Sequence, residues 1–161
     1  MTIKSKLTKT DFINVHYVIT YRSTPMKILM VIFLIYFLSS FLSILLMSPT
    51  SSSSGMFIAV AFLTIISLQT YFRAKNNFGP NNRICEQLEY NIENDNLLIK
   101  GESFNSQLTW EKFHRVTKTK NWLLIWQNSR MANPIPRRDI TNEEIDVLRT
   151  ILNNHQVKNN L

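Results

Sequence analysis

Two long, uncharged apolar segments constrain this chain more than any other feature. They cover residues 28–47 and 56–72, and neither contains Asp, Glu, Lys or Arg. A helix that crosses the roughly 30 Å hydrocarbon core of a bilayer needs about 20 apolar residues. The two segments therefore predict a transmembrane helical hairpin over residues 26–72, with the Ser-rich segment 48–55 as its connecting loop.

Basic residues flank the predicted hairpin on both sides. Arg22 and Lys27 precede the first apolar segment, and Arg73 and Lys75 follow the second, whereas the loop contains no basic residue. Because Lys and Arg accumulate on the cytoplasmic side of membrane helices, we expect both termini in the cytoplasm. A cleaved signal peptide is disfavoured because its apolar core would span only about 7–15 residues. A buried soluble hairpin is disfavoured because few soluble helices are apolar on every face.

Residues 1–25 are predicted to form an N-terminal cytoplasmic arm, which begins with a polar, basic stretch that we expect to be mobile. Tyr17 and Tyr21 follow at the spacing of one helical face, and Thr10 or Asp11 is the candidate cap of such a helix. The β-branched residues of this stretch also allow a strand. We favour a short amphipathic segment at the membrane surface, with both tyrosines at the level of the headgroups.

Small residues predict where the two hairpin helices touch. Ser39 and Ser43 lie on one face of the first helix, and Ala59 lies at the facing end of the second. Small side chains let helix backbones approach closely in lipid. These three residues are therefore the candidate helix–helix contact, and the lack of ionisable groups in either segment argues against a transport pathway.

The hydropathy pattern changes to period two after a predicted linker at residues 73–83. Apolar and polar residues alternate within residues 88–92, 97–100 and 104–110, which predicts short antiparallel strands joined by turns. Residues 122–126 are apolar on both faces. One face belongs in a core, and we expect the C-terminal helix, the membrane surface or a partner to cover the other.

The end of the chain predicts an edge strand and a helix. Two prolines in residues 131–136 remove ladder donors and exclude a central position in a sheet. Thr141 and Glu144 have the spacing of a capping box, which starts a helix over residues 141–153. Residues 84–153 are thus predicted to form a cytoplasmic β-rich domain with a C-terminal helix, followed by a polar tail at residues 154–161.

The chain offers little catalytic or ligand-binding chemistry. His16, His114 and His155 follow no metal-ligand spacing, and Cys85 has no neighbouring His, so we expect it in the core. Neither a phosphate-binding glycine loop nor a nucleophile motif is present. We therefore expect a non-enzymatic protein without a cofactor or a metal. The net charge of +7 gathers beside the apolar segments, which favours anionic lipid over nucleic acid as its partner.

Two groups of basic residues are the candidate contact with anionic headgroups or with an acidic protein partner. The first group follows Trp110, and alternation predicts that Lys118 and Lys120 share one strand face. The second group precedes the last helix. An ordinary solvated surface is the alternative for each of them. The six residues are Lys112, Arg115, Lys118, Lys120, Arg137 and Arg138.

In this region the chain resembles the YcxB-like family of small bacterial membrane proteins. The resemblance is carried by Leu108-Thr109-Trp110-Glu111-Lys112-Phe113 with Val116, by the strand at residues 122–126, and by Ile135-Pro136-Arg137-Arg138-Asp139-Ile140 before the last helix; Pro134 departs from the pattern. The resemblance implies an N-terminal arm, two spans of the inner membrane and a C-terminal domain similar to a small pleckstrin-homology-type β-barrel closed by a helix. The expected fold is therefore α+β, with a two-helix transmembrane hairpin and a small antiparallel β-barrel or sheet domain.

Two functional hypotheses follow. In the first, the hairpin anchors a cytoplasmic module that binds a protein partner or anionic lipid headgroups. In the second, the protein is an immunity or regulatory protein that acts inside the bilayer through its hairpin. Homo-oligomerisation is compatible with both hypotheses.

Overall fold

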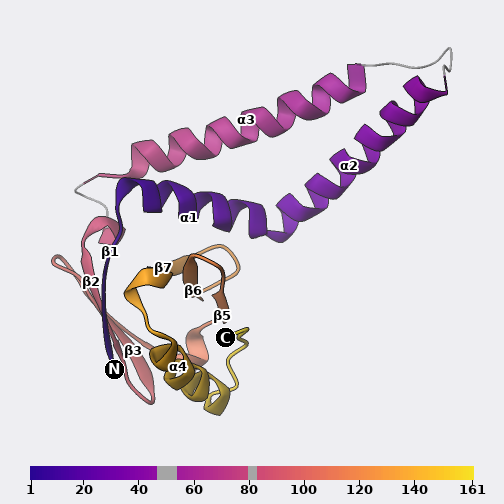
Figure 1. Ribbon diagram of the computed structural model, residues 1–161. Helices are drawn as coiled ribbons and strands as arrows, with labels where there is room; N and C mark the ends of the chain where they lie inside the picture. Colours follow the sequence, from indigo (N-terminus) through magenta and orange to yellow (C-terminus); the bar gives the residue numbers. More distant parts are fainter. Residues whose placement is uncertain (47–53, 80–82) are drawn as a thin grey trace. The chain divides into compact units, whose positions relative to one another are not determined.

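The computed structural model describes residues 1–46, 54–79 and 83–161 (Figure 1). The predicted loop between the two apolar helices lies largely outside the described residues. The α-helices are α1 (Lys9–Arg22), α2 (Thr24–Leu45), α3 (Ser54–Asn77) and α4 (Asn142–Asn154). The strands are β1 (Thr2–Lys6), β2 (Gln87–Ile92), β3 (Asn96–Lys100), β4 (Asn105–Thr109), β5 (Arg115–Lys118), β6 (Trp122–Trp126) and β7 (Ala132–Pro136), and the short 3₁₀ turns are η1 (Arg83–Cys85), η2 (Trp110–Lys112) and η3 (Arg137–Asp139).

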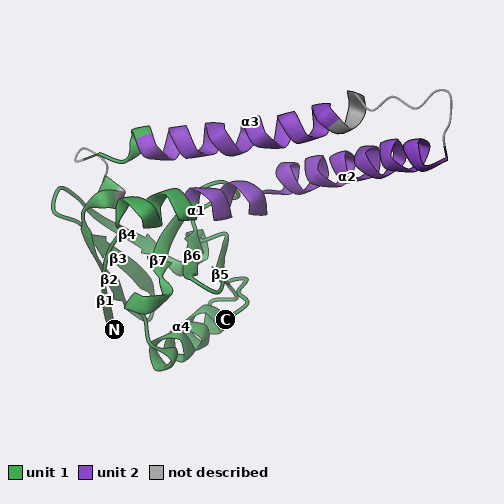
Figure 2. Ribbon diagram, turned by 45° about the horizontal axis from the view of Figure 1, so that its top comes forward, with its two compact units in different colours: residues 1–15, 76–161 green, residues 16–75 purple. Residues whose placement is uncertain are grey.

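The chain divides into two compact units (Figure 2). The first unit combines residues 1–15 with residues 76–161, and the second contains residues 16–75. The apolar hairpin is therefore an insertion within the first unit. The chain leaves that unit after its first strand and returns to it for the others.

The first unit contains two antiparallel sheets, ordered β1-β2-β3-β4 and β5-β6-β7. The expectation of a closed barrel is wrong, because the described strands form two separate ladders. The break between them falls at η2, where the chain turns at Trp110 instead of continuing the β4 pairing. A barrel would need uninterrupted pairing around its circumference.

The structure of the N-terminal segment differs more from the sequence-based prediction than that of any other element. The segment predicted to be mobile contains β1, which pairs with β2 from Thr2 opposite Asn91 to Lys6 opposite Gln87. The N-terminal ammonium group donates to the Ile92 carbonyl at 3.0 Å. Alternation is weak in β1 because Ile3 is its only large apolar residue, so the pairing with a distant strand decides its structure.

The stretch that allowed either helix or strand forms helix α1. Thr8, rather than Thr10 or Asp11, occupies the capping position. The Asp11 backbone N–H donates to the Thr8 hydroxyl at 3.2 Å, and the Thr8 backbone N–H donates to the Asp11 carboxylate at 3.0 Å. This reciprocal pair satisfies donors that the first helical turn leaves open.

The core of the first unit lies between the two sheets and α4. Trp110, Leu123 and Leu148 are fully buried in it. The predicted capping box starts α4: the Thr141 hydroxyl accepts from the Glu144 N–H at 3.2 Å, and the Glu144 carboxylate accepts from the Thr141 N–H at 2.8 Å. The proline-containing strand β7 lies at a sheet edge, as its composition predicts.

Both faces of β6 are buried, from Trp122 to Trp126. Leu123 and Ile125 join the core cluster that also contains the buried face of α4. On the opposite face, Trp122 lies beside Asp11 and Asn14 from the start of α1. The N-terminal segment therefore helps to cover this second face of β6, for which the sequence alone did not identify the covering element.

The end of the chain also packs more closely than its polar composition indicates. The Val116 N–H donates to the Lys158 carbonyl at 2.8 Å, and the Arg149 guanidinium donates to the Leu161 carbonyl at 2.9 Å. Val157 is buried in the core cluster. The predicted tail thus lies along the outer side of β5.

The second unit contains two helices that are long and apolar enough to cross a membrane, at residues 24–45 and 57–77. The side chains of α2 are all at least partly exposed, although most of them are large and apolar. Pro25 lies in the first turn of α2, where its missing N–H costs nothing. Arg73 and Lys75 belong to the last turns of α3, which continues to Asn77, so the linker is shorter than predicted.

Candidate functional site

Three of the six candidate basic residues converge on one polar pocket in the first unit. Lys120 comes from the turn between β5 and β6, whereas Arg137 and Arg138 come from η3. We call this site the basic pocket; it has a volume of about 220 Å³ and is lined by Asp11, Asn14, Lys120, Asn121, Trp122, Arg137 and Arg138. Segments that are far apart in the sequence therefore meet at one site.

An ion pair between Asp11 and Arg138 forms one wall of the basic pocket. The Arg138 guanidinium donates to the two carboxylate oxygens of Asp11 at 2.6 and 3.1 Å. The Thr8 hydroxyl donates to the same carboxylate at 2.7 Å. The hydrogen bond from Arg138, together with those from Thr8, outweighs burial and lowers the pKa of Asp11 to about 2. Asp11 is therefore ionised at neutral pH, with its acceptor oxygens occupied by bonds within the domain.

Asp139 adds a second carboxylate behind Arg138. The Asp139 carboxylate lies 3.5 Å from Nε of Arg138 and accepts the Ser5 hydroxyl at 2.7 Å. Hydrogen bonding to Asp11 raises the pKa of Arg138. Arg138 thus ties η3 to the N-terminal segment, and much of its charge is neutralised there.

Arg137 and Lys120 have no carboxylate partner among the described residues. The Arg137 guanidinium donates to the Ile140 carbonyl and to the Asn142 side-chain oxygen, which are both neutral acceptors. Lys120 is exposed, and among the described residues no side chain or carbonyl pairs with its ammonium group. Two cationic side chains without a carboxylate partner therefore line the pocket.

The other three candidate residues lie outside the pocket. The Arg115 guanidinium lies 4.6 Å from the centre of the Trp126 ring. Lys118 ends β5, where its backbone N–H donates to the Asn160 side chain at 2.7 Å. Lys112 is exposed on η2. Lys118 and Lys120 do not share a strand face, because β5 ends before the turn that contains Lys120.

Sequence reasoning missed the pocket residues that are not basic. Asp11 carried the clearest available signal, since it is the only acidic residue among residues 1–85 and lies among basic ones. A lone carboxylate in such surroundings indicates an ion pair, but not its partner. Asn14, Asn121 and Trp122 carry no local pattern that would group them.

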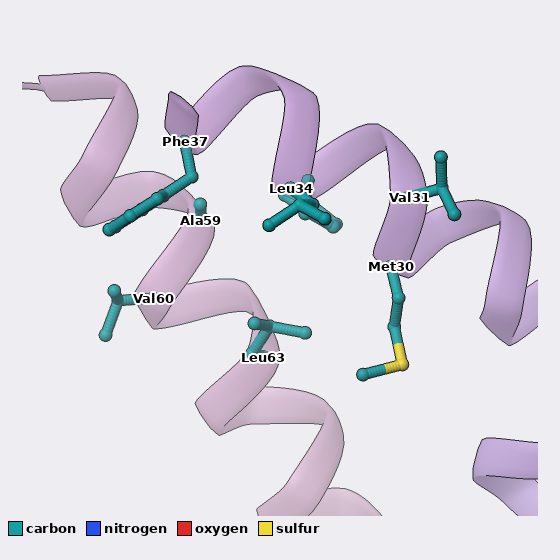
Figure 3. Close-up of a pocket in the computed structure, with 8 residues that line it drawn as sticks. Met30, Val31, Leu34, Phe37, Ala59, Val60 and Leu63 are labelled. Carbon is teal, nitrogen blue, oxygen red and sulfur yellow. The ribbon is translucent and has the colours of Figure 1, made fainter. Parts of the chain in front are cut away.

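The second unit contains an apolar groove of about 390 Å³ between α2 and α3. Figure 3 shows Phe37 and Leu34 from one helix facing Ala59 and Leu63 from the other. The rings of Phe33 and Phe62 also meet, with their centres 4.8 Å apart. Met30, Val31, Phe33, Leu34, Phe37, Ala59, Val60 and Leu63 line the groove.

The predicted helix–helix contact residues occupy different environments. Ala59 is 3% exposed and lies in the groove. The Ser39 hydroxyl donates to the Tyr36 carbonyl and the Ser43 hydroxyl to the Ser39 carbonyl, each at 2.9 Å. These bonds satisfy both serines within α2, so their contact with α3 stays a prediction.

Tyrosines of α1 bond to α3 within the second unit. The Tyr17 hydroxyl donates to the Ser67 carbonyl at 2.9 Å, and the Tyr21 and Ser67 hydroxyls are 2.7 Å apart. The two tyrosine rings are stacked, with centres 6.1 Å apart. These contacts hold the second half of α1 against α3.

The described residues contain no group of three or more His, Cys, Asp or Glu placed to hold a metal ion. Cys85 is half-buried in η1, and burial raises the pKa of its thiol. A thiol held protonated in this way is a poor nucleophile.

Comparison with known proteins finds one family model that matches a segment of this chain. The family model described as YcxB-like protein matches residues 92–152. Neither the curated proteins nor the solved structures give a match. The matched segment runs from the end of β2 into α4 and includes Lys120, Arg137 and Arg138 of the basic pocket. The resemblance expected from the sequence is thereby confirmed, and over residues 92–152 this chain matches the YcxB-like protein family.

Proposed function

We propose that this protein is a non-enzymatic interaction module anchored in the inner membrane by its α2–α3 hairpin. The folded first unit lies on the cytoplasmic side and binds a protein partner or anionic lipid headgroups. The six candidate basic residues supply the contact surface.

One observation carries this proposal: the hairpin is inserted within a single folded unit. Strand β1 precedes the hairpin and pairs with β2, which follows it. A domain that folds from both flanks of a hairpin requires both flanks on the same side of a membrane. An even number of spans meets that requirement, and the two candidate helices supply it.

The basic residues that flank the hairpin support a cytoplasmic location for both of its ends. Arg22 and Lys27 flank the start of α2, and Arg73 and Lys75 lie near the end of α3. All four are at the end of the hairpin that adjoins the folded unit along the chain. Basic residues at this end favour its retention in the cytoplasm.

We further propose that the first unit is a variant of the pleckstrin-homology architecture. Two antiparallel sheets of four and three strands, followed by a C-terminal helix, support this assignment. In this interpretation β1 is the first strand of the domain, and the hairpin occupies the connection between β1 and β2.

The alternative is a protein that acts through its hairpin. The apolar groove between α2 and α3 favours it, because small and aromatic side chains there leave a recess open to a membrane partner (Figure 3). The two proposals differ in which surface touches the partner.

Site-specific photocrosslinking in intact membranes distinguishes the proposals. A photoreactive residue replaces Lys112 or Lys118 on the folded unit, or Ile35 or Ile65 on the hairpin; Ile35 and Ile65 are 63% and 61% exposed. The anchored-module proposal expects adducts with one protein, or with lipid headgroups, from the first pair. Protein adducts from the hairpin pair alone would instead support action within the bilayer.

A further inference from the structure

The basic pocket has the composition of an anion site. Its four ionised side chains are three cations and one carboxylate, and Arg138 already pairs with that carboxylate. Lys120 and Arg137 then remain as uncompensated positive charges. A pocket with two such charges attracts an anion rather than a cation or a neutral solute.

The free donors in the basic pocket suit an oxyanion. The Lys120 ammonium has three N–H groups without a partner among the described residues. The side-chain amides of Asn14 and Asn121 are exposed, and within the described part of the chain no hydrogen bond occupies them. Ammonium, guanidinium and amide donors converging on one cavity match a group with several acceptor oxygens.

The pocket is also preorganised. Asp11 fixes Arg138 through two hydrogen bonds, and Ile140 and Asn142 fix Arg137. Trp122, which is 4% exposed, forms a rigid apolar wall. Side chains held in place before binding lose less entropy when a ligand arrives.

The sequence position of the pocket limits how far it can lie from the start of α2. Asn14 precedes Thr24, the first residue of α2, by ten positions. That path spans at most about 36 Å, even when fully extended. The pocket is therefore tethered within reach of the headgroup region.

We propose that the basic pocket binds a phosphate group, supplied by an anionic phospholipid headgroup or by a free phosphate ester. Lys120 and Arg137 contact the phosphate oxygens, and the side-chain amides of Asn14 and Asn121 donate further hydrogen bonds. The ion pair between Asp11 and Arg138 forms one wall of the pocket. The lipid source rests on the proposed function, whereas the free-phosphate source does not.

Protection of Lys120 from amine-reactive labelling tests the proposal on the full chain. The reference is protein in maltoside micelles, in a buffer without phosphate. One arm adds inorganic phosphate, with chloride added to the reference to match the ionic strength. The other arm uses nanodiscs that contain phosphatidylglycerol, in the same buffer without inorganic phosphate. Lys100, an exposed lysine of the same unit that lies outside the pocket and is not one of the six candidate residues, is the internal control.

We expect a ligand at about ten times its Kd to slow the labelling of Lys120 about tenfold, because about one tenth of the sites stay free. Labelling of Lys100 should not change. Protection by phosphate alone assigns a soluble ester, protection in the nanodiscs alone assigns a headgroup, and protection in both assigns phosphate from either source. Unchanged labelling of Lys120 in both arms, or equal protection of Lys100, would overturn the proposal.

Variants give a second, independent measurement. Lys120→Gln removes a side chain that has no structural partner, so the fold should persist. Calorimetry uses the source that the labelling assigns, either inorganic phosphate or short-chain phosphatidylglycerol, and the affinity for it should fall about tenfold or more. Lys100→Gln is the matched control and should leave the affinity unchanged. Equal affinities in both variants would refute the site, while the membrane-anchored module would still stand on the crosslinking result.

Discussion

Asp11 connects three parts of the molecule through one carboxylate. It completes the cap of α1 with Thr8, binds Arg138 of η3 and forms a wall of the basic pocket. Its side chain is 12% exposed, whereas that of Arg138 is 55% exposed. An ion pair with one buried member interacts more strongly than a solvated pair, because water screens it less.

Replacing Asp11 with Asn should destabilise the first unit. The substitution removes the charge from a buried, four-bonded group, and we expect a loss of about 2 kcal/mol. For a unit of this size, the melting temperature should fall by about 10 °C. Thermal unfolding of the full chain in micelles, followed by near-ultraviolet circular dichroism, measures this fall.

Asp146→Asn is the matched control for that experiment. Asp146 pairs with Arg149 at 2.6 Å, the same distance as between Asp11 and Arg138, but its side chain is 63% exposed. Solvated pairs of this kind contribute about 0.5 kcal/mol. Equal losses of stability in the two variants would show that burial of Asp11 does not strengthen its ion pair.

The same carboxylate predicts a dependence of stability on pH. The pKa of Asp11 is about 2 in the folded protein, against 3.8 for an unperturbed Asp. The unfolded chain therefore binds a proton first as the pH falls. The contribution of Asp11 to stability is complete above about pH 4 and is lost as the pH falls toward 2.

Comparing the wild type with Asp11→Asn isolates this effect from that of other carboxylates. We expect the difference in their unfolding free energies to be constant from pH 7 to about pH 5 and to shrink between pH 4 and pH 2. Urea denaturation at several pH values gives the two free energies. A difference that does not change down to pH 2 would contradict the assigned pKa.

At the scale of elements, β1 shows how the N-terminal segment belongs to the folded unit. Ile3 is 2% exposed and is part of the same core as Leu97 and Leu148. The strand precedes the hairpin, yet its hydrogen bonds are made to β2, which follows it. The domain is therefore incomplete without the segment on the far side of the hairpin.

Ile3→Ala should reveal this dependence. Truncating a buried Ile costs about 2–5 kcal/mol, through lost burial and the cavity that remains. Lys4→Ala on the exposed face of the same strand should change stability by less than about 0.5 kcal/mol, because its pair with Glu89 is solvated at 3.7 Å. Chemical denaturation of both variants measures the difference, and a stable Ile3→Ala variant would mean that β1 is dispensable.

The whole molecule combines an α+β unit with a hairpin whose large apolar side chains face outward. Ile35, Leu45 and Phe57 are each more than 60% exposed. Exposed apolar surface of this extent is costly in water and stable in lipid. If the hairpin crosses a bilayer as proposed, its insertion between β1 and β2 requires both of its ends on one side.

Reporter fusions test that arrangement. A reporter active only outside the cytoplasm should be active when inserted among residues 51–54 and inactive when fused after Leu161. The basic flanks and the shared folded unit both predict this result. The opposite pattern would reverse the orientation, and activity at both positions would exclude a two-span hairpin.

Several elements were predictable because their signals are local. The capping box of α4, the strands of the meander and the edge position of β7 each depend on a few neighbouring residues with a fixed spacing. The basic residues were recognised as a group, but the pocket was not. The pocket forms because the β5–β6 turn, η3 and α1 lie together in the fold. No residue spacing along the sequence indicates that these three segments are neighbours.

The amino-acid order is enough to establish two membrane-length apolar helices, a region of short strands and a capped final helix. The length of an apolar segment, the periodicity of a strand and the cap of a helix are each set by residues close together in the sequence. They do not depend on a distant part of the chain. The fold alone decides that β1 completes the first sheet and that Asp11 meets Arg138, 127 positions away. Backbone donors and single charges are common to many residues, so only three-dimensional packing selects which of them pair.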